Sequence, residues 1–165
     1  MSDFLAIDPG NSESAYAWID GNRRPVYSEK LPNEALLEAL RTKALGEAAD
    51  CVAVEMVASY GMAVGADVFE TCVWIGRFAE AVHHRTGVAP LLVKRSPVKL
   101  HHCRSLRAKD SNIRQALVDR FAPGESNHGK GTKAQPGWFY GFHSDVWQAY
   151  ALAVYVADQA EEAAA

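Results

Sequence analysis

The chain has 165 residues, of which 48% are hydrophobic and 22% charged. These values are typical of one globular domain and exclude disordered, collagen-like and long coiled-coil proteins. No apolar run approaches the roughly 20 residues of a membrane span, and the start MSDFLAID lacks the pattern of a signal peptide. Three cysteines without a C-x-x-C pair favour a reduced protein. We therefore expect a single cytoplasmic domain over residues 1–165 that has no contact with a membrane.

The charges of the chain are unevenly distributed. The formal net charge is only −3, which by itself argues weakly against a nucleic-acid partner. Residues 1–84, however, hold 6 Lys and Arg against 13 Asp and Glu (net −7), and residues 134–165 hold none against 4 (net −4). Residues 85–133 hold 11 against 3 (net +8). Such a basic segment is expected where one face binds phosphates, although a solvated charged surface would look the same.

Hydrophobic periodicity and turn residues divide the chain into short strands and amphipathic helices. The sequence predicts strands over 4–7, 15–20, 24–31, 51–54 and 91–93. It predicts helices over 34–45, capped by Asn33, over 69–84 and 111–121, and over 145–160, capped by Ser144. Residues 124–142 are rich in Gly and Lys and are expected to form a mobile loop. Three strands followed by alternating strands and helices predict a mixed α/β sheet flanked by helices.

Two predicted buried strands each lead into a carboxylate. Asp8 follows FLAI, Glu55 follows CVAV, and a third carboxylate, Asp145, falls in the first turn of the last predicted helix. If the two strands are neighbours, Asp8 and Glu55 emerge side by side at the edge where open α/β sheets bind ligands. With Asp145 they would form an oxygen-rich site for Mg²⁺ or Mn²⁺. Asp8 could instead hold the Asp-Pro-Gly turn, and Asp145 could simply favour the helix dipole, whereas Glu55 beside an apolar run needs a partner.

Four sequence blocks in this order are similar to one known family. They are FLAIDPG, VAVEMVASYGMAVGADVFETCVWIGRF, RAKDSNIRQALVDRF, and GKGTK followed by PG, YG and SDVWQAYALAV. From about Phe4 to Val156 the chain resembles the RuvC-like Holliday-junction resolvases, specifically their phage-type branch. The resemblance implies an RNase H-like fold with a mixed five-stranded sheet, and a homodimer that acts in DNA recombination and repair. It also implies symmetric nicking of four-way DNA junctions with Mg²⁺ or Mn²⁺.

The resemblance also assigns the residues of the site. The family's first three acidic residues fall on Asp8, Glu55 and Asp145, and a fourth, usually acidic, falls on Gln148. Gln148 can bind a metal through its amide oxygen but brings no charge. His143 is a further possible ligand or proton shuttle, with a solvated loop residue as the alternative. The implied reaction is phosphodiester hydrolysis with two cations roughly 4 Å apart, bridged by Asp8, giving a 5′ phosphate and a 3′ hydroxyl.

In this interpretation the basic segment binds DNA. The residues expected along the DNA path are Lys94, Arg95, Lys99, Arg104, Arg107, Lys109 and Arg114, with Lys130 and Lys133 in the loop before Asp145. Tyr60, after Glu55, could stack at the junction centre or pack against a helix. The helix over 69–84, with Gly76 permitting close approach, is the candidate dimer face, and core packing against the sheet is its alternative.

Other functions fit parts of the sequence. The D-x-G start also occurs in actin-like sugar kinases and ATPases, but these need a second lobe that 165 residues cannot supply. The adjacent pair His101-His102 before Cys103 is not expected to bind metal, because adjacent side chains point apart. A nuclease of the same fold with broader branched substrates stays open. So does a DNA-structure-binding protein that has lost cleavage, which the neutral Gln148 favours.

Overall fold

The computed structural model describes residues 2–42, 44–45 and 49–165. Its single sheet has the strand order β3-β2-β1-β4-β5. The strands are β1 (Asp3–Asp8), β2 (Glu13–Ile19), β3 (Pro25–Pro32), β4 (Ala49–Met56) and β5 (Leu91–Lys94). The first three strands form an antiparallel meander, and β4 and β5 continue the sheet in parallel with β1. The predicted mixed five-stranded sheet is therefore confirmed.

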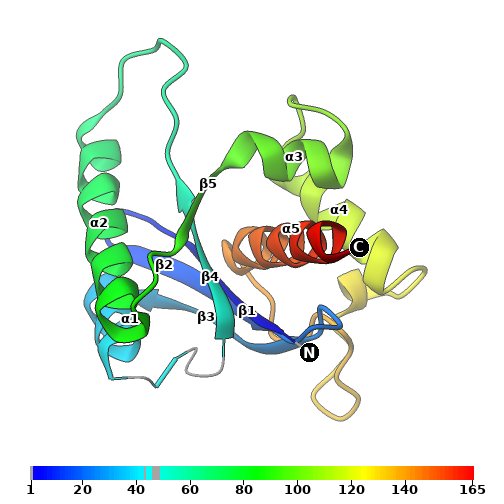
Figure 1. The fold of residues 1–165 in the computed structure, drawn as a ribbon. Coiled ribbons are helices and arrows are strands. Elements are labelled where there is room, and N and C mark those ends of the chain that lie inside the picture. The colour runs from blue at the N-terminus through cyan, green and yellow to red at the C-terminus, as the bar shows by residue number, and fades with distance from the viewer. Residues whose placement is uncertain (1, 43, 46–48) are drawn as a thin grey trace.

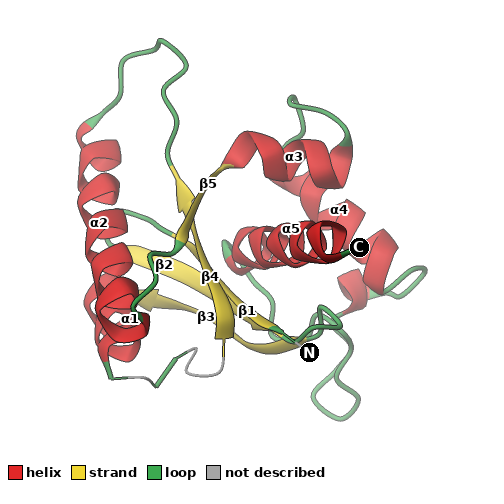
Figure 2. Ribbon diagram, viewed as in Figure 1, coloured by secondary structure: helices red, strands yellow, loops and turns green. Residues whose placement is uncertain are grey.

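Helices cover both faces of this sheet (Figures 1 and 2). They are α1 (Asn33–Arg41), α2 (Ala66–Thr86), α3 (Arg95–Cys103), α4 (Asp110–Phe121) and α5 (Val146–Ala164), with a short 3₁₀ turn, η1, at Asn127–Gly129. The helices α1 and α2 lie on one face, and α3, α4 and α5 lie on the other. Within the described residues, no helix is both long and apolar enough to cross a membrane.

Strand alternation assigns side chains to the two layers. In β1, Leu5 and Ile7 join the core beneath α1 and α2, whereas Phe4 and Ala6 face α5. The residues facing α5 from the three central strands are mostly small, namely Ala6, Ala15, Ala17 and Ala53, all at most 1% exposed. Because methyl groups occupy little depth, the alanine-rich α5 packs directly on β1 and β2. The N-terminus of α5 is thereby held over the sheet.

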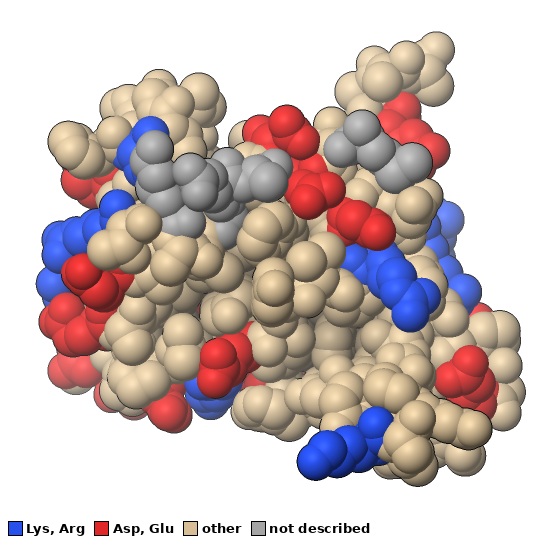
Figure 3. All heavy atoms as spheres, turned by 90° about the horizontal axis from the view of Figure 1, so that it is seen from below, with Lys and Arg blue, Asp and Glu red and all other residues tan. Residues whose placement is uncertain are grey.

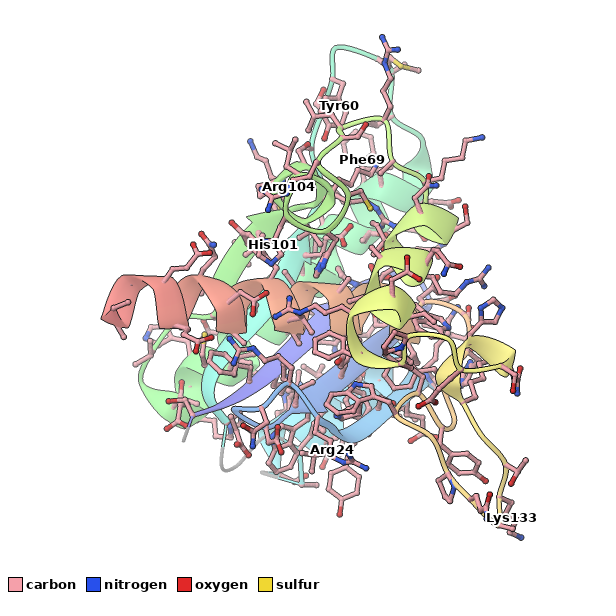
Figure 4. The ribbon with its side chains drawn as sticks, turned by 90° about the vertical axis from the view of Figure 1, so that its right-hand side faces the viewer. Arg24, Tyr60, Phe69, His101, Arg104 and Lys133 are labelled. Atoms are coloured by element: carbon pink, nitrogen blue, oxygen red, sulfur yellow. The ribbon has the colours of Figure 1, made fainter. Side chains whose placement is uncertain are left out.

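The C-terminal half of α5 is fixed by a buried charge cluster around Asp158. This carboxylate accepts hydrogen bonds from Arg120 (2.6 and 3.0 Å) and Arg23 (3.0 Å), and His101 Nε2 lies 2.7 Å from it. Burial opposes ionisation, but these partners lower the pKa of Asp158 to about 2. His101 lies against α5 in Figure 4. The cluster ties the β2–β3 turn, α3 and α4 to one position on α5.

The segment 124–142 is more firmly packed than its composition suggests. Phe139 and Phe142 are at most 1% exposed and contact Trp147 and Tyr150 of α5. A small hairpin closed by the Gly131–Pro136 bridge projects from the surface, with Lys133 at its tip (Figure 4). The predicted mobility of this loop stays a prediction, and the exposed parts of the segment are residues 124–128, the hairpin and residues 140–141.

Four local predictions are wrong, and one of them, the Asn33 cap of α1, is described with the site below. Residues 95–103 form the helix α3, which the sequence did not reveal. Helix α1 ends at Arg41 rather than at Leu45, and residue 43 of the predicted helix lies outside the described residues. The residue before α5 is Asp145, not Ser144, because Ser144 has a positive φ of 45° and makes no capping hydrogen bond.

Candidate functional site

The sheet brings two of the predicted carboxylates together. Asp8 is the last residue of β1, which pairs in parallel with β4 so that Ile7 lies opposite Val54. The next pair in this register is Asp8 and Glu55, and both side chains stand on the α5 face of the sheet. The predicted placement of Asp8 and Glu55 at the carboxyl edge of neighbouring strands is confirmed.

A buried hydrogen-bond network fixes the turn after Asp8. Ser14 Oγ donates to Asn33 Oδ1 (2.6 Å), Asn33 Nδ2 donates to the Gly10 carbonyl (2.9 Å), and the Gly10 N–H donates to Ser14 Oγ (3.1 Å). A Cβ atom at Gly10 would lie 2.3 Å from the Glu13 carbonyl oxygen, so only glycine fits there. Asn33 was expected to cap α1, but its side chain is buried in this network and makes no cap.

The third carboxylate approaches from α5. Asp145 is the residue before this helix and lines a pocket of about 280 Å³ together with Gln148. The other lining residues are Asp110, Ser111, Arg114, Ser144 and Trp147. Gln148 is only 6% exposed, one helical turn after Asp145, as the i, i+3 spacing predicted. His143 is exposed in the preceding turn.

Asp8 is the carboxylate with the least support from neighbouring donors. Burial raises its pKa well above the ordinary value, and the nearby carboxylate of Glu55 raises it further, with smaller contributions from Asp145 and Asp110. Arg95 opposes this shift. Among the described residues, no group donates a hydrogen bond to the Asp8 side chain. A partly buried carboxylate in this setting favours a bound cation.

Two basic side chains already engage the other carboxylates. Arg95 Nη1 donates to Glu55 Oε1 at 3.2 Å, and the same guanidinium group also pairs with Asp110 at the start of α4. Lys30 Nζ of β3 donates to Asp145 Oδ2 at 2.7 Å. The sequence placed Arg95 on the DNA path and Lys30 outside the basic segment, whereas the structure puts both within the site. Asp110 was also missed.

These ion pairs determine which carboxylates of the site are free to bind a metal ion. Oxygen donors from carboxylates fit Mg²⁺ or Mn²⁺, and Asp8 with Glu55 provides them. In the described part of the chain, however, no group of three or more His, Cys, Asp or Glu residues is placed to hold an ion together. This agrees with Glu55 being turned to Arg95 and Asp145 to Lys30. The adjacent histidines are structural, since His101 contacts Asp158 and His102 contacts the Ala151 carbonyl.

The remaining basic residues of the predicted DNA path lie in and around α3 and α4 and in the hairpin region. Lys94 precedes α3, Lys99 lies in it, Arg104 and Arg107 follow it, Lys109 precedes α4, Arg114 lies in α4, and Lys130 and Lys133 belong to the hairpin region. Arg104 lies toward the Tyr60 end of the molecule in Figure 4, and Lys133 lies at the opposite end. Figure 3 shows the end of the molecule at which β4 begins, and on that face both signs of charge are mixed. Contact of these residues with DNA stays a prediction.

Tyr60 lies in the long loop between β4 and α2. Its side chain is 72% exposed, and its hydroxyl group forms a 2.7 Å hydrogen bond with Ser96 Oγ at the start of α3. The ring is therefore tethered at its tip, yet its faces are open to solvent. The ring of Tyr60 is therefore not buried against a helix. Stacking of this ring on DNA stays a prediction.

Comparisons with known proteins give a clear result for the fold. The sequence matches no protein-family model and no curated protein. The structure is similar to that of RuvC from Thermus thermophilus, with a TM-score of 0.66 over 98% of this chain and 96% of that chain, at 17% identity. T. thermophilus RuvC in complex with a Holliday junction substrate gives a TM-score of 0.59 at the same coverage and identity. The chain thus has the RuvC form of the RNase H-like fold, a mixed five-stranded sheet with flanking helices.

Proposed function

We propose that the chain is a structure-specific DNA endonuclease that resolves four-way junctions by paired, metal-dependent nicks. The observation that carries the proposal is the Asp8–Glu55 pair at the carboxyl edge of a sheet whose fold matches RuvC. A RuvC of this fold is known in complex with a Holliday junction substrate. Membership of the phage-type branch, and with it action in the host cytoplasm, belongs to the same proposal.

The proposed reaction is hydrolysis of one phosphodiester bond in each of two strands. The oxygen of a water molecule bonds to phosphorus, the P–O3′ bond breaks, and the products are a 5′ phosphate and a 3′ hydroxyl. Asp8, Glu55 and Asp145 are the carboxylates that would hold Mg²⁺ or Mn²⁺, which when bound lowers the pKa of water and offsets phosphate charge. The exposed Lys94, Arg104 and other basic residues bind the DNA backbone and position the strand.

Paired nicks need two sites related by a two-fold axis, so we propose a homodimer. Helix α2 supports this. Its inward residues pack on the sheet and α1, but Phe69 and Val73 are 63% and 62% exposed. Gly76 faces open space on the same helix, so a partner backbone can come close. This helix thus serves the core with one face and offers the other to a second copy.

One alternative function has an observation in its favour. Glu55 and Asp145 are ion-paired with Arg95 and Lys30, and Gln148 brings no charge. These pairs would suit a protein that binds branched DNA but has little cleavage activity. A second alternative, a nuclease acting on many branched DNAs, uses the same site and differs only in substrate range.

Nicking of synthetic DNA separates these functions. The substrate is an immobile four-way junction with each strand labelled in turn, and a linear duplex of the same sequence is the control. We expect nicks in two opposite strands with Mg²⁺ or Mn²⁺, none with chelator, and products that DNA ligase reseals. Binding without nicks in either ion would support the binding protein, and equal nicking of forks would support the broader nuclease. No preference for the junction in binding or nicking would overturn the proposal.

A further inference from the structure

Lys30 occupies the same cross-strand row of the sheet as Asp8. Asp8 lies opposite Ala15 in the β1–β2 pair, and Ala15 lies opposite Lys30 in the β2–β3 pair. Strands are about 4.8 Å apart, so the Cα atoms of Asp8 and Lys30 are separated by about 10 Å. The residue between them carries only a methyl group and is fully buried. Lys30 can therefore extend over it toward the N-terminus of α5.

The ammonium group of Lys30 ends inside the carboxylate site. Its Nζ lies 2.7 Å from Asp145 Oδ2, and its side chain is only 25% exposed. A lysine side chain is protonated at neutral pH. This ion pair therefore places one positive charge on the side of Asp145.

The site has too little negative charge to hold the two divalent ions that the resemblance implied. Two divalent ions need carboxylates on both sides of the phosphate. On the α5 side, Lys30 neutralises the charge of Asp145, and Gln148 carries no charge. On the sheet side, Asp8 has no hydrogen-bond donor among the described residues, and Glu55 stands beside it. Arg95 pairs with Glu55, but it shares its single charge with Asp110, so negative charge remains on this side. The charge balance leaves one position for a divalent ion, at Asp8 and Glu55.

We propose that Lys30 supplies the positive charge that a second divalent ion provides in two-ion nucleases, so that each chain binds one Mg²⁺ or Mn²⁺. The inference rests on the proposed nuclease function and narrows its ligand set, because Asp145 then positions Lys30. As water bonds to phosphorus, the electron pair of the P–O3′ bond stays on O3′, which takes a proton from solvent, and the water releases one. Lys30 remains protonated and stabilises the charge on the phosphate oxygens.

The test counts bound Mn²⁺ ions, by electron paramagnetic resonance of the free ion and by calorimetric titration. We expect one Mn²⁺ per chain in the wild type, in Lys30→Arg and in the remote control Arg41→Met. The Lys30→Met/Gln148→Glu variant restores two unpaired carboxylates on the α5 side and should bind two. Nicking by Lys30→Met should fall on the order of 100-fold at low Mn²⁺. Nicking by the double variant should recover at high Mn²⁺, and below saturation its rate should rise with the square of the Mn²⁺ concentration.

The outcomes separate this inference from the function on which it rests. Two Mn²⁺ ions per chain in a wild type that nicks junctions would overturn the inference and leave the nuclease intact. Wild-type nicking by Lys30→Met with one bound ion would also overturn it. A wild type that neither binds Mn²⁺ nor nicks would remove the proposed function itself. The wild-type count needs no variant, so a failure of Lys30→Met to fold would not protect the inference.

Discussion

Arg95 and Glu55 are joined by a hydrogen bond of 3.2 Å between Nη1 and Oε1, although 40 positions separate them in the chain. Glu55 lies opposite Val93 in the β4–β5 pair, and Arg95 begins α3 directly after β5. The strand pairing therefore delivers the guanidinium group to the carboxylate. Burial raises the pKa of Glu55, and Arg95 limits that rise, so it helps to keep the carboxylate ionised.

Replacing Asp8 with Asn should abolish nicking while junction binding stays intact. The change removes the charge of the one site carboxylate that lacks a hydrogen-bond donor among the described residues and keeps its shape. The measurement is nicking of a labelled junction in Mn²⁺ beside a gel-shift titration of the same junction. The matched control is Glu13→Gln, an exposed carboxylate in β2. Nicking by Asp8→Asn at the wild-type rate would contradict the metal mechanism.

The basic surface should determine how DNA affinity depends on salt. Each phosphate contact on duplex DNA releases about 0.9 counterion. The Lys94→Ala/Arg104→Ala/Lys109→Ala variant removes three exposed charges and should flatten the slope of log affinity against log salt by up to about 2.7.

Arg41→Ala, on α1 across the sheet, is the control for this experiment and should keep the wild-type slope. Lys30 is not a suitable control because it lies in the site. An equal effect of the control and the triple change would show that DNA follows a different surface.

The exposed apolar face of α2 should hold the proposed dimer together. Val73→Glu places a charge on a residue that is 62% exposed in one copy, so folding of the single chain should be unaffected. Light scattering should show a dimer for the wild type and a monomer for Val73→Glu. Val88→Glu, at an exposed residue beyond the end of α2, is the control. A monomeric wild type, with junction DNA bound, would rule out this arrangement.

Stability should fall between pH 6.5 and 4 because of His102. Its Nε2 lies 2.8 Å from the Ala151 carbonyl, and burial lowers its pKa to about 4. The unfolded chain takes up the proton near pH 6.5 and the folded chain only near pH 4. Stability therefore decreases by about 3 kcal/mol as the pH falls through this window.

Urea unfolding across this pH range measures the effect, and His102→Gln, which can still donate to Ala151, should flatten it. The neighbouring His101, Asp158 and Arg120 are unchanged in that variant. The same pH slope in both proteins would assign it to another group.

The two strand carboxylates were predictable because each ends a short apolar run, and runs of this kind form neighbouring strands in α/β sheets. The helix α3 was hidden, since Pro97 and two adjacent histidines do not read as a helix, although proline is tolerated in a first turn. The sequence does not reveal that Lys30 belongs to the site, because its position in space depends on how β2 and β3 pair. The register of these strands shifts by a bulge between Trp18 and Ile19, which the turn after Asp20 does not predict.

Helix α5 is held at two points, by Asp145 over the sheet edge and by the Asp158 cluster at the far end. The two aspartates are 13 positions apart in the chain, about 20 Å along the axis. Inserting or deleting one residue between them would turn one end by about 100° against the other and move it by about 1.5 Å. Either Asp158 would leave its arginines or Asp145 would leave Lys30. This stretch can exchange residues one for one, but it cannot change its length.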